Sequence, residues 1–237
     1  MAVSGRFEGR IALITGASRG IGAAVAKRYA REGAHVILLA RTAGGLEEVD
    51  DAIRKAGGVA TLFPCDLRKL EGLDPLGPSI LDRFGGLDIF VANAAVLGVL
   101  SPLGHIDPAT WRRAFEVNVH ANWRLIRTLD PLLKRSSAGR AIFVTDGVAS
   151  KPLPYWGVYG AAKAALEHLA RTWAAESAKT PLKVNLIEPG PVATRLRAEA
   201  FPGEAADKLR QPEDVTDAFV ELASPDCQTS GRIVELD

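Results

Sequence analysis

Short apolar runs alternate along the chain with longer segments whose apolar residues recur at helical spacing. The apolar runs lie at 11–14, 35–40, 59–63, 87–92, 141–145, 183–187 and 232–235. The helix-type segments lie near 21–32, 45–56, 74–84, 107–135, 158–178 and 212–223. Runs without polar alternation are typical of strands covered on both faces, which form parallel sheets joined by helices. The pattern therefore predicts an α/β fold built on a doubly wound parallel sheet.

The composition is consistent with one domain and restricts the partners. The chain has 237 residues, 47% of them hydrophobic, without a linker or repeat, which predicts a single domain over 1–237. The net charge of +1 gives no footprint for nucleic acid. Cys65 and Cys227 are the only cysteines, as expected in a reduced compartment, and we predict no metal site. Because the chain has no signal-peptide pattern and no apolar stretch long enough to span a bilayer, we expect a cytoplasmic protein without a membrane partner.

The stretch Thr15–Gly22 reads Thr-Gly-Ala-Ser-Arg-Gly-Ile-Gly and lies between the first predicted strand and the helix that follows it. Gly16 permits a tight turn, Gly20 allows a ligand close to the backbone, and Gly22 allows the helix to pack closely on the strand. The N–H groups at the start of the helix then favour a bound phosphate. The alternative is an ordinary tight turn between a strand and a helix.

The second predicted strand ends at Arg41, where dinucleotide-binding folds have an acidic residue for the ribose 2′-hydroxyl. A guanidinium instead suits a 2′-phosphate, which it binds through two parallel hydrogen bonds. Arg19, inside the glycine-rich turn, is placed to supply a second positive charge. Arg41 alone is as consistent with a solvated cation at a strand end, but the pair favours NADP(H) over NAD(H) as the cofactor.

Three further polar residues follow predicted strands or interrupt an apolar helix. Asp66 follows the third strand, where a carboxylate accepts a hydrogen bond from an adenine amino group or caps the next turn. Asn93 follows the fourth strand, where its amide bridges strand ends or ties a turn. Asn118 lies in an apolar helix centre, and it is either a core polar group satisfied by the backbone or a residue that directs backbone or water toward a site.

Tyr159 and Lys163 lie four residues apart on a predicted helix that starts after Gly157, so they share one face. A phenol has a pKa of about 10 and is a poor acid or base near neutral pH. A nearby ammonium favours the phenolate and lowers that pKa, which would make Tyr159 a proton donor and acceptor for a carbonyl–alcohol pair. The alternative is an ordinary Tyr/Lys pair on a helix surface.

These motifs together resemble the short-chain dehydrogenase/reductase family over essentially the whole chain. The resemblance is carried by Thr15-Gly16-x-x-x-Gly20-x-Gly22, Asn93-Ala94, Asn118, Tyr159-x-x-x-Lys163 and Pro189-Gly190. It implies a seven-stranded Rossmann sheet that binds NADP(H), and hydride transfer between the nicotinamide and a carbonyl or secondary alcohol. It also implies that Tyr159 is the general acid/base, that Lys163 lowers its pKa and holds the nicotinamide ribose, and that Asn118 maintains a water link to Lys163.

The resemblance implies a set of cofactor-binding residues as well. The expected contacts to the adenine, its ribose and the nicotinamide amide are, in that order, Asp66 and Leu67, Asn93 and Ala94, and Val192 and Thr194. The full expected set is Gly16, Ser18, Arg19, Gly20, Ile21, Arg41, Asp66, Leu67, Asn93, Ala94, Tyr159, Lys163, Pro189, Gly190, Val192 and Thr194.

One catalytic position departs from the family pattern. The family places a serine about thirteen residues before the tyrosine, where it orients and polarises the substrate oxygen, whereas this chain has Asp146. An ionised Asp146 would raise the pKa of Tyr159 and repel a developing alkoxide. A protonated Asp146 would donate a hydrogen bond to the substrate oxygen as serine does, and an impaired site would bind cofactor but turn over slowly. The three alternatives stay open, so a dinucleotide-binding sensor or scaffold with little catalysis is the alternative function.

Apolar residues near the site bear on the choice of substrate, and apolar residues on two helices bear on the oligomeric state. The residues expected around the mouth of the pocket, which suggest a hydrophobic carbonyl compound, are Val96, Leu97, Val148, Pro154, Tyr155, Trp156 and Pro191. Residues 194–211 are expected to form a lid over the site. The helices at 107–135 and 158–178 carry surplus apolar residues, among them Trp111, Phe115, Trp123 and Trp173, which favour a homodimer or homotetramer.

Overall fold

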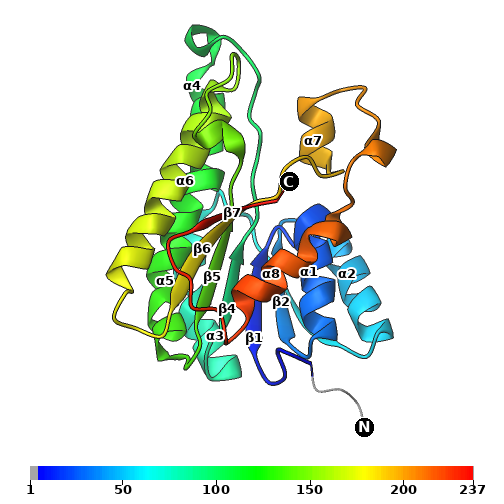
Figure 1. Cartoon of the computed structure of the whole chain (residues 1–237), viewed down its shortest axis with the longest axis vertical. Helices are drawn as coiled ribbons and strands as arrows, with labels where there is room; N and C mark the ends of the chain where they lie inside the picture. Colours follow the sequence, from blue (N-terminus) through cyan, green and yellow to red (C-terminus); the bar gives the residue numbers. More distant parts are fainter. Residues whose placement is uncertain (1–4, 237) are drawn as a thin grey trace.

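The fold is a single parallel sheet with helices on both faces (Figure 1). The structure is a computed structural model that describes residues 5–236. Its seven strands pair in parallel in the order β3-β2-β1-β4-β5-β6-β7, which confirms the predicted doubly wound sheet. The strands are β1 (Ile11–Thr15), β2 (His35–Ala40), β3 (Val59–Pro64), β4 (Ile89–Ala92), β5 (Arg140–Val144), β6 (Lys183–Glu188) and β7 (Ile233–Glu235).

The helices divide between the two faces of the sheet (Figure 1). One face is covered by α1 (Gly20–Arg31), α2 (Ala43–Lys55) and α8 (Thr216–Ala223), and the other by α3 (Leu76–Phe84), α5 (Ala121–Arg135) and α6 (Gly157–Glu176). The segment predicted as one helix over 107–135 begins at α4 (Pro108–Phe115), where Asp107 accepts hydrogen bonds from the first turn as an N-cap. A single π-helical turn, Glu116–His120, joins α4 to α5. The short helix α7 (Arg195–Ala200) lies in the segment expected to form a lid.

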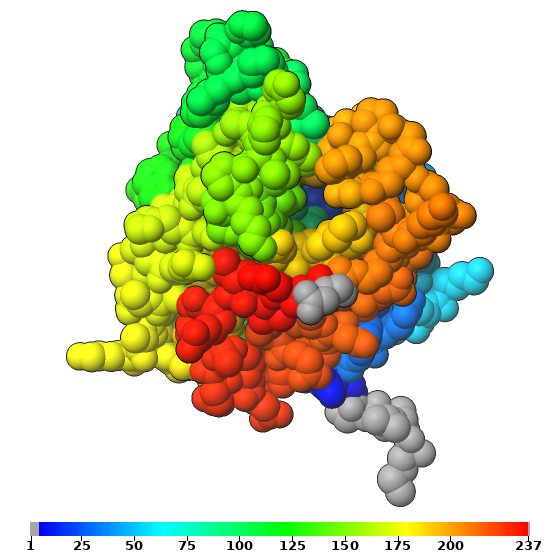
Figure 2. Space-filling view, turned by 45° about the horizontal axis from the view of Figure 1, so that its top comes forward, coloured from blue at the N-terminus to red at the C-terminus, as the bar shows by residue number. Residues whose placement is uncertain are grey.

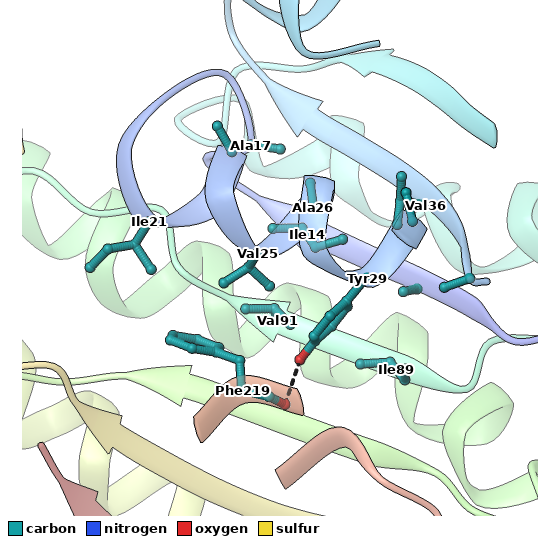
Figure 3. Packing of buried hydrophobic residues seen from close by; sticks show 14 of the residues in the cluster. Ile14, Ala17, Ile21, Val25, Ala26, Tyr29, Val36, Ile89, Val91 and Phe219 are labelled. Atoms are coloured by element: carbon teal, nitrogen blue, oxygen red, sulfur yellow. Dashed lines mark hydrogen bonds between the residues drawn. The ribbon is translucent and has the colours of Figure 1, made fainter. Parts of the chain in front are cut away.

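Residues on alternate sides of each strand belong to different cores. Ala12 and Ile14 of β1 pack toward α1, whereas Leu13 packs toward α3 and α5, which explains why residues 11–14 of the strand are all apolar. Figure 3 shows the first core, in which the ring of Tyr29 on α1 lies over β1 and β4. The Tyr29 hydroxyl donates a hydrogen bond to the backbone oxygen of Phe219 at 2.8 Å, which ties α8 to α1.

Two buried arginines hold the amino-terminal edge of the sheet to the end of α8. Arg140, which starts β5 and is 3% exposed, donates hydrogen bonds to the backbone oxygens of Gly139, Pro181, Ser224, Pro225 and Cys227. Arg10 donates to the backbone oxygens of Ala223 and Ala138. Because the last carbonyl groups of a helix have no partner within the helix, these guanidinium groups satisfy them.

The strand order reverses between β1 and β4, since β1 pairs with β2 on one side and with β4 on the other. Connections that leave such a pair run to opposite faces, so a crevice opens outside the carboxyl ends of the two strands. This crevice is where the fold positions a ligand.

Candidate active site

A cavity of about 410 Å³ opens at the carboxyl edge of the sheet. Figure 2 shows its mouth as a hollow between the green and orange segments of the chain, with blue residues of the first turn at its floor. Every residue of the expected cofactor-binding set lines it, and so does Asp146. Among the predicted catalytic and cofactor-binding residues, Asn118 alone lies outside the lining. The fold therefore brings the residues predicted from the sequence together around one cavity.

The first turn between β1 and α1 has the geometry expected of a phosphate-binding corner. Gly16 has a φ of +67°, which favours glycine. A Cβ on Gly22 would lie 2.4 Å from the backbone oxygen of Gly16, so the close approach of helix and turn requires glycine there. Arg19 precedes α1 without making a side-chain cap, and the first turn of α1 carries no acidic residue. The N–H groups at the start of α1 therefore face the cavity in a field that favours an anion.

Two arginines border the cavity beside this corner. Arg19 and Arg41 both line it, and within residues 5–236 neither forms an ion pair or a side-chain hydrogen bond. The Arg41 charge makes a small contribution to the lowered pKa of Asp66, which lines the same cavity. The pair is thus available for an anionic group at the edge of β2.

Asp66 forms the turn that the sequence suggested as an alternative to adenine binding. Its carboxylate accepts a hydrogen bond from the backbone N–H of Arg68 at 3.0 Å and pairs with the Arg68 guanidinium. Hydrogen bonding to Arg68 is the main cause of its lowered pKa. Arg68 also lines the cavity, as does Arg113 of α4, and sequence reasoning missed both. The position of Arg68 two residues after Asp66 was the available signal, since turn carboxylates often bind such neighbours.

Asn93 joins the two strands that flank the switch point. Its side-chain nitrogen donates to the backbone oxygens of Thr15, at 2.9 Å, and Gly16, at 3.4 Å. In return, the Thr15 hydroxyl accepts from the backbone N–H groups of Asn93 and Ala94. The expected bridge between strand ends is confirmed, and it holds the small residue Ala94 against the cavity.

Asn118 is satisfied by the backbone, one of the two alternatives that the sequence left open. It is 1% exposed, and its side-chain amide both accepts from the N–H of Val96 and donates to its oxygen, each at 2.9 Å. The backbone oxygen of Asn118 accepts a hydrogen bond from Asn122. The π-helical turn places this amide beside the loop after β4, and the water link to Lys163 stays a prediction.

The residues expected to carry the chemistry meet where β5 ends and α6 begins. Tyr159 and Lys163 are both buried in α6 and line the cavity. The Lys163 ammonium donates a hydrogen bond to the backbone oxygen of Val144 at 2.7 Å and lies 5.6 Å from the centre of the Tyr159 ring. Asp146 follows β5, and its Oδ1 accepts from the N–H of Val148 at 3.1 Å.

The electrostatics of Tyr159 differ from the sequence-based expectation. Burial raises the pKa of the Tyr159 phenol, and the neighbouring Asp146 carboxylate raises it further. The expectation that Lys163 lowers this pKa is therefore wrong for the protein without cofactor. Burial lowers the pKa of Lys163 itself to about 8, although the charges of Asp146 and Glu167 partly offset that effect. Glu167 also accepts a hydrogen bond from the Thr145 hydroxyl at 2.6 Å.

Replacing Lys163 by methionine is expected to stabilise the cofactor-free protein at pH 7 by about 2 kcal/mol, because a buried charge is removed. The folded pKa of about 8 lies below the usual 10.5, so between these values the unfolded chain binds more protons. Native stability therefore rises with pH in that window, and the advantage of the variant should shrink. Urea unfolding across this pH range measures the difference, and Lys179→Met at an exposed lysine is the control. A variant less stable than the native protein at pH 7 would contradict the expectation.

An aromatic wall covers the phenol from the side of α7. The Trp156 ring lies 6.0 Å from Tyr159 and 5.6 Å from Phe201, measured between ring centres. Val96 and Trp156 line the cavity as expected, whereas Pro154, Tyr155 and Pro191 do not. Leu97 and Val148 also lie outside the lining, but they pack in the same apolar cluster as Tyr159. Phe201 was missed because its distance from Tyr159 in the chain gives no local signal.

Residues 194–211 form an ordered segment whose two ends meet. Thr194 caps α7 by accepting a hydrogen bond from the N–H of Arg197. A bridge pairs Val192 with Arg210, and the N–H of Ala193 donates to the Arg210 backbone oxygen at 2.8 Å. The Arg210 guanidinium donates to the backbone oxygens of Pro189 and Leu236. The segment thus projects from a clamped base and places Phe201 over the site.

The apolar surplus on the helices is smaller than the sequence suggested. Trp173 is buried in the core, where it packs against Phe143 and donates to Asp130, so it is not available to a partner. Trp111 and Trp123 are exposed by 37% and 48%.

Among residues 5–236, no helix is long and apolar enough to cross a membrane.

Comparisons with known proteins agree with this site. Residues 10–205 match the family model for short chain dehydrogenases. The uncharacterized oxidoreductase YciK of Escherichia coli K12 is 36% identical over 223 residues, which cover 92% of this chain and 87% of the relative. The 3β-hydroxysteroid dehydrogenase 1 of Eggerthella lenta is 35% identical over 232 residues, which cover 92% of this chain and 88% of that protein. A solved short chain dehydrogenase from E. coli CFT073, complexed with NADPH, superposes with a TM-score of 0.94 at 35% identity and covers 98% of each chain.

Proposed function

The chain belongs to the short-chain dehydrogenase/reductase family, and from this we propose that it is an NADP(H)-dependent oxidoreductase. It transfers a hydride between the nicotinamide and a carbonyl or secondary alcohol substrate. The observation that carries the proposal is that Tyr159 and Lys163 line the same cavity as the phosphate-binding corner of β1 and α1. A module that only binds a dinucleotide has no need of this acid/base pair.

The residues present fit the cofactor. The corner at Gly16 and the start of α1 suit a pyrophosphate, and Arg19 and Arg41 suit a 2′-phosphate. Asp66 is held by Arg68 beside the place proposed for the adenine. The NADPH bound to the similar E. coli structure supports the same choice. When bound, the reduced cofactor supplies the hydride, and the chain supplies position and a proton.

Tyr159 is proposed as the proton donor to the substrate. Its raised pKa keeps the phenol protonated at neutral pH, which is the form that reduction needs. The Lys163 ammonium donates one of its three N–H groups to the Val144 oxygen. The other two N–H groups can donate to the nicotinamide ribose and the phenol. We assign Asn118 a positioning part, because it holds the backbone of Val96 at the edge of the cavity. The water link from Asn118 to Lys163 remains part of this proposal.

A second function, a dinucleotide-binding sensor with little catalysis, is favoured by one observation. Asp146 contributes to the raised pKa of Tyr159, which opposes formation of the phenolate that alcohol oxidation requires. NADPH consumption against a panel of carbonyl compounds, in the native protein and in Asp146→Ser, separates the two functions. Turnover by the native protein supports the oxidoreductase, a large gain in Asp146→Ser supports an impaired native site, and NADPH binding with no turnover in both proteins supports the sensor.

Replacing Arg41 by alanine is expected to weaken NADPH binding by about 10- to 100-fold while NADH binding changes little, because only NADPH carries the 2′-phosphate. Titration of protein fluorescence with each cofactor measures the two dissociation constants. Arg31→Ala, at an exposed arginine of α1 outside the cavity, is the matched control. An equal loss for NADPH and NADH would contradict the assignment of Arg41.

We also propose self-association as a homodimer or homotetramer. The exposed Trp111 and Trp123 on α4 and α5 supply apolar area for a second copy. Sedimentation equilibrium tests the proposal, and a monomer at micromolar concentration would overturn it.

A further inference from the structure

We propose that the site prefers a protonated carbon–nitrogen double bond, the iminium form of an apolar cyclic imine, to a neutral ketone, and that Asp146 binds the positive nitrogen. This inference rests on the proposed function and specifies its substrate class. It follows from the charges that surround the reacting position and from the direction in which charge moves during reduction.

The Asp146 carboxylate faces the cavity without a cationic partner. Its Oδ1 accepts the N–H of Val148, and a hydrogen bond with the Tyr159 phenol is one cause of the raised pKa of that phenol. No arginine or lysine of the described chain forms an ion pair with it. The carboxylate therefore lies in the cavity beside the Tyr159 phenol, with no arginine or lysine paired to it.

The other charged groups near this position do not neutralise the carboxylate. The Lys163 ammonium of α6 is attracted to Asp146 but donates its hydrogen bond to the Val144 oxygen, and Glu167 adds a second negative charge. Glu188 of β6 adds another, since the Asp146 charge contributes to its raised pKa. Further out, Glu235 of β7 is negative and Lys151 positive, and both act on Glu188. The site is thus better suited to a substrate that brings a positive charge than to one that develops a negative charge.

A ketone and an iminium ion move charge in opposite directions. Hydride addition to a ketone breaks the C=O π bond and places negative charge on oxygen, beside Asp146, where the family serine would have donated a hydrogen bond. Hydride addition to an iminium carbon turns the C=N π pair into the nitrogen lone pair, so the nitrogen goes from positive to neutral. Its N–H donates to the Asp146 carboxylate throughout. NADPH is oxidised to NADP, and the neutral amine then takes a proton from water.

The walls of the cavity suit the body of such a substrate. Trp156 and Phe201 present aromatic rings beside Tyr159, and Leu196 and Ala200 add apolar surface from α7. Aromatic faces attract cations as well as apolar groups. The Phe201 ring already carries the Arg197 guanidinium at 3.7 Å from its centre, and Arg197 is paired with Glu204. An apolar ring with one positive nitrogen therefore matches both the wall and the carboxylate.

Binding to the NADP complex tests the charge preference without turnover. Tetrahydroisoquinoline, an ammonium at neutral pH, and its neutral isostere isochroman are titrated by calorimetry. We expect the ammonium to bind at least about 10-fold more tightly, and Asp146→Asn to remove that preference. Glu188→Gln, which removes a nearby charge outside the cavity lining, is the matched control and should keep it. Equal binding of the two ligands by the native complex would overturn the inference.

Turnover of dihydroisoquinoline and tetralone by the native protein gives the second measurement. The imine should be reduced faster, and Asp146→Ser should shift the ratio toward the ketone by about 100-fold, because it restores a donor and removes the charge. Faster ketone reduction by the native protein would identify a protonated Asp146 and overturn the inference. NADPH binding with no imine turnover would overturn the substrate class, whereas failure of the native protein to bind NADPH would overturn the proposed function itself. Thermal unfolding of Asp146→Asn and Asp146→Ser establishes that both variants are folded.

Discussion

Replacing Tyr159 by phenylalanine is expected to lower kcat for carbonyl reduction by about 1,000-fold and to leave NADPH affinity nearly unchanged. General acid/base groups contribute about 100- to 10,000-fold, and the phenol is the only side-chain hydroxyl proposed to act on the substrate here. The ring fills the same volume without the hydroxyl, so the apolar cluster with Leu97 and Ala200 is preserved. Steady-state kinetics with a small panel of carbonyl substrates measures the effect on kcat. Titration with NADPH measures the effect on cofactor affinity.

Tyr155→Phe is the matched control for this prediction. Tyr155 lies four residues earlier, is 59% exposed and does not line the cavity, so loss of its hydroxyl should leave kcat within about twofold. Equal effects at the two positions would contradict the general acid assignment. A large loss of NADPH affinity in Tyr159→Phe would instead assign the phenol a part in holding the cofactor.

Replacing Arg140 by methionine is expected to destabilise the protein by about 4 kcal/mol. The substitution removes a buried guanidinium and leaves the backbone oxygens of Pro225 and Cys227 without that donor, at a cost of about 1–3 kcal/mol for each buried group, while the Ser224 oxygen keeps the N–H of Cys227. Partial hydration and the apolar methionine side chain offset some of this loss. Urea unfolding at neutral pH measures the free energy of unfolding.

Two variants accompany the Arg140 measurement. Arg135→Met, at an exposed arginine near the end of α5, should change stability by less than about 0.5 kcal/mol. Arg140→Lys retains the charge but not the planar set of donors, so an intermediate loss is expected. A loss below about 1 kcal/mol in Arg140→Met would show that these carbonyl groups find other donors.

The strands and the positions of the glycine-rich corner could be predicted from the sequence because both depend on local patterns. Each predicted strand overlaps the observed one, because strands buried on both faces are apolar over most of their consecutive residues. The π-helical turn at Glu116–His120 was not predictable, because its cause is the pairing of Asn118 with the backbone of Val96, a contact with a distant loop.

The sequence predicts which residues line the site better than it predicts their pKa values. Strand-end residues converge whenever the sheet is parallel, so the expected cofactor-binding residues line one cavity. The pKa of Tyr159 depends instead on burial and on the neighbouring Asp146 carboxylate, neither of which the spacing of Tyr159 and Lys163 reports. Burial of Trp173 and the placement of Phe201 likewise depend on tertiary packing, which residue spacing does not report.

The clamped base of residues 194–211 has a consequence for how this fold acquires new specificity. Because Val192 and Arg210 are already paired, the conformational cost of closing the loop depends only weakly on its length. Insertions or replacements between Thr194 and Arg210 would leave both the paired base and the proposed cofactor contact Thr194 in place. The segment that faces the substrate can therefore change in sequence and length during evolution. The dinucleotide-binding corner at the far side of the crevice need not change with it.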